Sequence, residues 1–281
     1  MDLTARERQW ALGVKEAVRL SEDIDSALVS DFDVACHALI GRGDETQALE
    51  RIKGMETFRR TYGIDDSVEQ GSRYMQEFVR MQPGALLKLE SCPITQEGVV
   101  IWDAAAFCSS LPLTPSTRDV ARGPWNWEVH VVTAYYMLRA LHSCFDSVRE
   151  GVFLICECDG SSARLSVECE TRLYHELGVC FPYKVKQIMC YNTGSKSPLY
   201  WSLLKPMMPQ STWNKLRLGC RLEDEDSGPI KPVQGRIPRQ KRRLSEFYLQ
   251  STMEGDNHYV VQGTRDMLAR REGNETAFRL S

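Results

Sequence analysis

Hydrophobic side chains recur at helical spacing through the first third of the chain, and polar residues fill the positions between them. Glycines at 41, 43 and 63 interrupt this pattern. Apolar residues spaced three and four apart indicate amphipathic helices. The pattern predicts helices over 5–29, 33–41, 45–62 and 67–82. We therefore expect residues 1–82 to form a small all-helical N-terminal domain.

The spacing of apolar residues changes after Pro83-Gly84. Short apolar runs predict strands, and longer periodic segments between them predict helices. The strands are expected over 97–103, 151–158 and 184–191, and the helices over 124–147, 162–177 and 197–207. Strands that alternate with helices favour an α/β fold with a mostly parallel sheet flanked by helices. We assign residues 83–222 to this domain.

The last part of the chain, residues 223–281, is charged and rich in proline near its start. We expect a partly flexible tail, with residues 223–242 flexible and short helices near 243–250 and 264–272. A basic cluster within 236–245 fits a solvated linker best, with a nuclear localisation signal and a membrane tether as alternatives.

Composition excludes several classes of protein. The chain has 281 residues, of which 42% are hydrophobic and 26% are charged, with a net charge of −3. These values exclude a collagen-like, coiled-coil or mostly disordered chain. No apolar run approaches the ~18 residues of a membrane span, and the start lacks a secretory signal, so we expect a cytoplasmic protein. Its ten scattered cysteines are then expected to be small apolar core residues rather than disulfides.

No enzyme signature occurs in the sequence. We find no phosphate-binding loop, dinucleotide fingerprint, nucleophile elbow or zinc motif, and the five histidines have no ligand spacing. We therefore expect no catalytic residue, no metal and no cofactor. Asp103, at the end of a predicted strand, is the best candidate for a catalytic carboxylate, although a capping role is commoner. An enzyme that uses Asp103 or a cysteine is therefore one hypothesis, and we rank it third, after the two membrane-related functions described below.

One segment, residues 178–220, carries an ordered set of motifs. They are Phe181-Pro182, Lys184 and Lys186 on a strand, Asn192, a hydrophobic helix over 197–204, Lys205-Pro206, and Lys215 with Arg217. This order resembles the closing half of the CRAL-TRIO lipid-binding domain family, which includes carriers of tocopherol and retinaldehyde. Segments 97–107 and 151–160 are similar to its first and central strands, and the helical leader is similar to its N-terminal domain. The resemblance covers residues 5–220.

The chain also departs from the family pattern. Only Arg42 remains of an arginine-rich leader motif, Asn192 is followed by Thr193-Gly194, and Ser211 replaces a lysine. These departures concern the phosphoinositide contacts and leave the predicted fold unchanged.

The resemblance implies a non-enzymatic carrier, which shields a small hydrophobic lipid in an enclosed pocket and transfers it between membranes. Such a pocket needs apolar walls and a few polar anchors. From strand position and the family pattern, the expected pocket residues are Val99, Ile101, Phe107, Tyr135, Leu138, Phe153, Ile155, Ile188, Cys190 and Leu203. The alternative role for each is plain core, and the Tyr135 hydroxyl is a candidate contact for a lipid head group.

The resemblance further implies a mobile gate helix over 197–208, and a basic patch that contacts phosphoinositides or another anionic membrane surface. The gate residues are Leu199, Tyr200, Trp201, Leu204, Met207 and Met208. The basic residues are Lys184, Lys186, Lys205, Lys215 and Arg217. We expect transient membrane association and no nucleic-acid partner. The alternative is a regulatory membrane-binding module, which acts through a protein partner without net lipid transfer.

Overall fold

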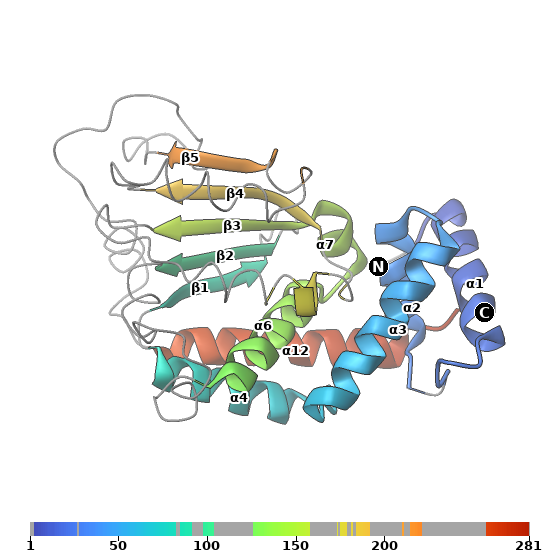
Figure 1. Ribbon diagram of the computed structural model, residues 1–281, viewed down its shortest axis with the longest axis horizontal. Coiled ribbons are helices and arrows are strands. Elements are labelled where there is room, and N and C mark those ends of the chain that lie inside the picture. The colour runs from blue at the N-terminus through green and yellow to red at the C-terminus, as the bar shows by residue number, and fades with distance from the viewer. Residues whose placement is uncertain are drawn as a thin grey trace, which may run out of the picture.

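The protein has an α/β fold, in which helices pack beside a five-stranded sheet (Figure 1). The computed structural model describes residues 3–26, 28–82, 85–91, 98–103, 126–157, 173, 175–178, 181, 184–191, 210, 214–220 and 257–280. The sheet order is β1-β2-β3-β4-β5. β1 is antiparallel to β2, while β2 to β5 are parallel. The predicted class, an α/β fold with a mostly parallel sheet, is confirmed.

Four helices form the first part of the chain. They are α1 (Ala5–Leu20), α2 (Asp31–Gly41), α3 (Glu45–Tyr62) and α4 (Val68–Met81). A polar side chain caps the amino end of each: Thr4, Ser30, Asp44 and Ser67, respectively. Such caps satisfy backbone N–H groups that have no partner inside the helix. The helix expected over 5–29 ends at Leu20, because Ser21 has extended backbone angles.

The strands are β1 (Leu86–Ser91), β2 (Gly98–Asp103), β3 (Val152–Glu157), β4 (Val185–Tyr191) and β5 (Leu216–Cys220). The central three match the strands predicted from the sequence. The two edge strands, β1 and β5, were not predicted. β1 pairs with the next strand along the chain, β2, and β5 pairs with β4, so each completes the sheet at one side.

The prediction of a single helix over 124–147 is wrong. The chain instead forms α6 (Trp127–Leu141) and α7 (Phe145–Glu150). Between them Cys144 is extended, and the Ser147 hydroxyl donates to its carbonyl and accepts from its N–H group. The apolar pattern runs through the break because both helices are buried on several sides. Periodicity alone therefore did not locate the break.

The final helix, α12 (Asn257–Ala277), is longer than the expected 264–272 helix and packs on α4, α6, α2 and β1 (Figure 1). Gly71 of α4 allows this close packing, since a Cβ atom there would lie 2.6 Å from Leu268 and 2.8 Å from Tyr136. The expected charged tail, 223–281, thus contains a helix of the core. Residues 223–250 of that tail, with the basic cluster, lie outside the described residues.

Two hydrophobic clusters cross the expected domain boundary at residue 82. One joins α3 and α4 to α6, α12 and strands β1–β3. The other joins α1, α2 and α3 to α7, Phe278 and Leu280. The N-terminal helices therefore share their cores with the rest of the chain. Among the described helices, none combines the length and apolar character needed to cross a membrane.

Candidate functional site

The register of the parallel strands determines which side chains share a face of the sheet. Val99 pairs with Phe153, Ile101 pairs with Ile155, and Ile155 pairs with Met189. Successive strand residues point to opposite faces. The odd-numbered residues of β2, β3 and the last part of β4 therefore lie on one face, and the even-numbered residues lie on the other.

The two faces have different neighbours. Val100 and Val152, with Leu154 and Trp102 beside them, belong to the cluster that includes helices α4, α6 and α12. The other face carries Ile101, Ile155, Met189 and Tyr191, with Val99 and Phe153 packed against them. We call these six residues the apolar strand face. Among the described residues, every member of this cluster is on a strand.

The apolar strand face is nevertheless withdrawn from water. The exposed fraction is 0% for Ile101 and 1% for Tyr191. Aliphatic, aromatic and thioether side chains supply its surface, and Gln187 of β4 follows the same alternation at its amino end. Such a surface fits an apolar molecule, and the Lys186 ammonium group lies 5.5 Å from the ring centroid of Phe153 at one end of it.

The structure divides the predicted pocket residues. Val99, Ile101, Phe153 and Ile155 lie together on the apolar strand face. The placement of Ile188 and Cys190 with them is corrected: they pair with Leu154 and Cys156, on the opposite face. β4 contributes Met189 and Tyr191 instead, which the sequence analysis missed.

The remaining pocket residues are elsewhere. Tyr135 and Leu138 lie on α6 and belong to the helix-covered cluster, with Tyr135 fully buried. Phe107 and Leu203 lie outside the described residues. The same holds for the predicted gate helix, with Leu199, Tyr200, Trp201, Leu204, Met207 and Met208, and for Lys205.

Three of the predicted basic residues lie at one edge of the sheet. Lys184 directly precedes β4, Lys186 lies within it, and Lys215 directly precedes β5. Because β4 and β5 are parallel, their amino ends point to the same edge, although β5 begins opposite Ile188, whose N–H group donates to the Lys215 carbonyl. We call Lys184, Lys186 and Lys215 the basic edge. Arg217 follows on β5, in register with Met189.

The basic edge adjoins the carboxyl end of α7. The Lys184 Nζ donates to the Arg149 carbonyl at 2.7 Å, and the Lys186 Nζ lies 3.3 Å from the Glu150 carboxylate. Burial, together with the charge of Lys184, lowers the pKa of Lys215. Burial is the larger of the two causes, and the charge of Lys184 adds to it.

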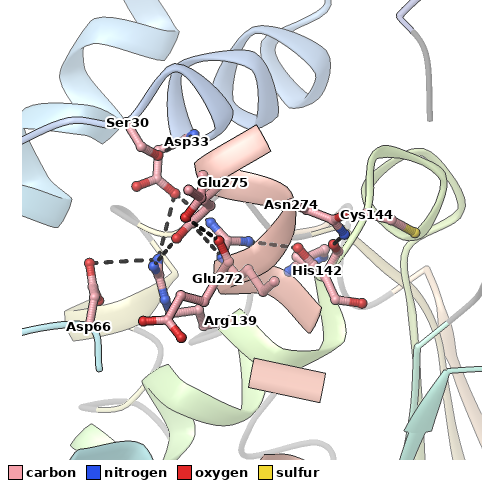
Figure 2. A network of polar contacts seen from close by, with 12 residues as sticks. Ser30, Asp33, Asp66, Arg139, His142, Cys144, Glu272, Asn274 and Glu275 are labelled. Atoms are coloured by element: carbon pink, nitrogen blue, oxygen red, sulfur yellow. Dashed lines mark hydrogen bonds and ion pairs between the residues drawn. The ribbon is translucent and has the colours of Figure 1, made fainter. Parts of the chain in front are cut away.

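A buried network of ionic groups, which the sequence analysis missed, lies where four helices meet (Figure 2). Its three cations are Arg59 of α3, Arg139 of α6 and Arg271 of α12, and its three anions are Asp33 of α2, Asp66 and Glu275 of α12. The positive and negative charges are therefore equal in number. The Arg271 side chain is only 1% exposed.

The contacts of the network range from short hydrogen bonds to longer ion pairs, such as the 3.7 Å between the Arg139 Nη1 and Asp33. The Arg59 Nη2 lies 2.9 Å from Asp33 and 2.7 Å from Asp66. The Glu275 carboxylate forms ion pairs with the Arg139 Nη2 at 2.7 Å and with the Arg271 Nε at 2.9 Å. Arg271 also pairs with Asp33 and donates to the His142 carbonyl at 2.6 Å.

The network also accounts for the buried hydroxyl of Tyr135. This hydroxyl donates to Asp66 and accepts from the Arg59 Nε at 2.9 Å. Its hydrogen bonds are thus to protein groups, in place of the lipid head group that the sequence suggested. Burial alone would raise the pKa of Asp33, but the three guanidinium groups outweigh burial and hold that pKa well below its usual range.

One signal in the sequence pointed to this network. Arg139 lies in the run VHVVTAYYMLRAL, which is otherwise almost wholly apolar. A buried arginine is tolerated only when carboxylates or other acceptors pair with it. The sequence did not identify those partners.

The arrangement contains no recognisable catalytic centre among the described residues. Asp103 ends β2 in register with Glu157. No group of three or more potential metal ligands occurs in the described ranges. Neither protein-family models nor the curated proteins contain a match to this chain. The CRAL-TRIO resemblance therefore stays a prediction.

The buried network predicts a large effect of removing one charge. Replacement of Arg271→Met should lower the free energy of unfolding by about 3–5 kcal/mol, because the carboxylates of Asp33 and Glu275 lose a buried partner. The control is Arg80→Met, which removes the same charge from an exposed pair with Glu77. This control should leave the urea concentration at the midpoint of unfolding nearly unchanged. Urea denaturation of both variants measures the difference. Equal midpoints would contradict a stabilising role for the network.

Three buried histidines predict that acid destabilises the fold. Burial lowers the pKa of His37, His130 and His142 to about 3 each, whereas an unfolded histidine titrates near 6.5. Below pH 6.5 the unfolded chain therefore binds more protons, so that stability is present above this pH and is lost as the pH falls. The slope should approach roughly 4 kcal/mol per pH unit near pH 5.

Denaturation midpoints measured between pH 7.5 and 5 test this slope. The His37→Leu variant should have a smaller slope, because one of the three titrating groups is removed. The replacement breaks no hydrogen bond within the described part of the chain, where neither ring nitrogen of His37 has a partner. A stability that is independent of pH over this range would refute the prediction.

Proposed function

We propose that this protein binds a small hydrophobic lipid against the apolar strand face and carries it between membranes. The observation that supports this most is the difference between the two faces of the sheet. Helices α4, α6 and α12 contribute to the cluster on one face. On the other face the described cluster consists of strand side chains alone.

An apolar ligand gains affinity from such a surface because its own apolar area leaves water. Burial stabilises a complex by roughly 25 cal/mol per Å² of apolar area. A contact of a few hundred Å² would therefore contribute several kcal/mol before the costs of binding are subtracted. In this proposal the lipid contacts Val99 and Phe153, which are half-buried, and extends over the neighbouring side chains of Ile101, Ile155, Met189 and Tyr191.

The rest of the mechanism rests on the CRAL-TRIO resemblance. In this proposal the segment 197–208 acts as the gate over the bound lipid, and the basic edge contacts a phosphoinositide or another anionic lipid head group. Each lysine near an anionic membrane surface contributes about 1 kcal/mol to binding. Lys184, Lys186 and Lys215 are close enough along one sheet edge to act on the same membrane surface.

Lipid bound to the purified protein is the first test. Organic extraction followed by mass spectrometry should recover a hydrophobic lipid, and the protein should speed the transfer of that lipid between two populations of liposomes. Binding to liposomes without transfer would favour the regulatory module instead. A protein that contains no lipid and transfers none would refute the proposal.

A matched pair of variants locates the ligand. Val99→Trp adds bulk to a half-buried valine on the apolar strand face, and Val261→Trp makes the same change at a half-buried valine of α12. We expect the first variant to lose most of the bound lipid and the second to retain it. Circular dichroism checks that both fold. Equal lipid content in the two variants would place the ligand elsewhere.

The basic edge predicts binding to anionic vesicles. The double variant Lys184→Ala/Lys215→Ala should bind phosphatidylcholine vesicles that contain phosphatidylinositol bisphosphate about 30-fold more weakly, since two lysines are removed from the surface. The control, Lys53→Ala/Arg80→Ala, removes two charges from exposed pairs on α3 and α4. Co-sedimentation measures both. Equal losses in the two variants would show that only net charge matters.

A further inference from the structure

Two cysteines lie side by side on neighbouring central strands. Cys156 of β3 and Cys190 of β4 are direct partners in the parallel register. Residues that are directly paired in a sheet point to the same face. Both thiols are reduced in the structure. They lie on the face opposite Ile155 and Met189, and so are separate from the apolar strand face.

The spacing of the strands suits a bond between these thiols. Neighbouring strands are about 4.8 Å apart, and the Cα atoms of disulfide-linked cysteines are usually about 4.4–6.8 Å apart. A disulfide can therefore join the two strands without a change of register, once their Cβ atoms move from about the strand spacing to the roughly 3.5–4.5 Å that a disulfide requires. A sequence separation of 34 residues hides this pairing from motif searches, which look for closely spaced cysteines.

The two thiols differ in access to solvent. Cys156 is half-buried, whereas the exposed fraction of Cys190 is 0%. Oxidants react first with the more accessible thiol, and a neighbouring thiol then resolves the product. Cys36 offers a contrast in the same chain, because it is fully buried in the helical core and burial raises its pKa to about 12.

We propose that Cys156 and Cys190 form a site of reversible oxidation by a peroxide. The Cys156 thiolate attacks one peroxide oxygen, an S–O bond forms, the O–O bond breaks, and the first water leaves after protonation. The Cys190 sulfur then attacks the Cys156 sulfur, an S–S bond forms, the S–O bond breaks, and the second water leaves. In total, two thiols lose two electrons and two protons, and one hydrogen peroxide is reduced to two waters.

The product would fasten β3 to β4 near their carboxyl ends. A dithiol reductant would reverse the reaction by thiol–disulfide exchange. This inference does not depend on the proposed lipid function, because the thiols lie on the other face of the sheet.

Peptide mapping after oxidation tests the inference. Cys158 shares a tryptic peptide with Cys156, so the experiment uses the full chain with Cys158→Ser. The folded protein is treated with hydrogen peroxide, alkylated, and digested without reduction. We expect a linked peptide pair that joins Cys156 to Cys190, is two hydrogens lighter than the sum of its parts, and disappears with dithiothreitol. Separate alkylation of both cysteines, or linkage of Cys156 to another cysteine, would overturn the proposal.

A second measurement follows the intermediate. In Cys190→Val, on the same background, the Cys156 sulfenic acid has no resolving thiol, and dimedone should trap it. In the parent the disulfide forms instead, and dimedone should label Cys156 weakly. Cys36 should remain unlabelled in both proteins. Equal dimedone labelling of Cys156 in variant and parent would show that Cys190 does not resolve it.

Discussion

Three buried arginines and three carboxylates hold together parts of the chain that lie far apart in sequence. Arg59, Arg139 and Arg271 come from three different helices, and their partners include Asp33 of α2. A charge in a protein interior is costly unless opposite charges surround it. These groups therefore tolerate burial only when α2, α3, α6 and α12 are assembled together. The network makes the position of each helix depend on the others.

The position of these helices determines which face of the sheet they pack against. Helices α4, α6 and α12 provide the side chains that pack with Val100 and Val152 on one face. Gly71, which lacks a side chain, lets α12 approach α4 closely enough to do so. On the opposite face, the cluster formed by the described residues consists of strand side chains. The contrast between the two faces, rather than any motif, is the strongest support for a hydrophobic ligand.

Sequence analysis selected four of the six residues of the apolar strand face and missed the two that β4 contributes. The period of two in β2 and β3 correctly grouped Val99 and Ile101 with Phe153 and Ile155. In β4 the same reasoning selected Ile188 and Cys190, which are one position out of phase. The register shifts between Val152 and Phe153, and a shift of one residue moves every side chain to the other face. A single sequence contains no sign of that irregularity.

What the sequence alone determined was local: the amphipathic helices of the first third, the three central strands, and the α/β class that their alternation implies. These follow from periodicity and capping, which act over a few residues. Only the tertiary structure decided the break between α6 and α7, the docking of α12 and the partners of the buried charges. Asp33 and Arg271 are separated by 238 positions. The sequence shows that each is charged, but only their juxtaposition in the folded chain makes either charge stable in the core.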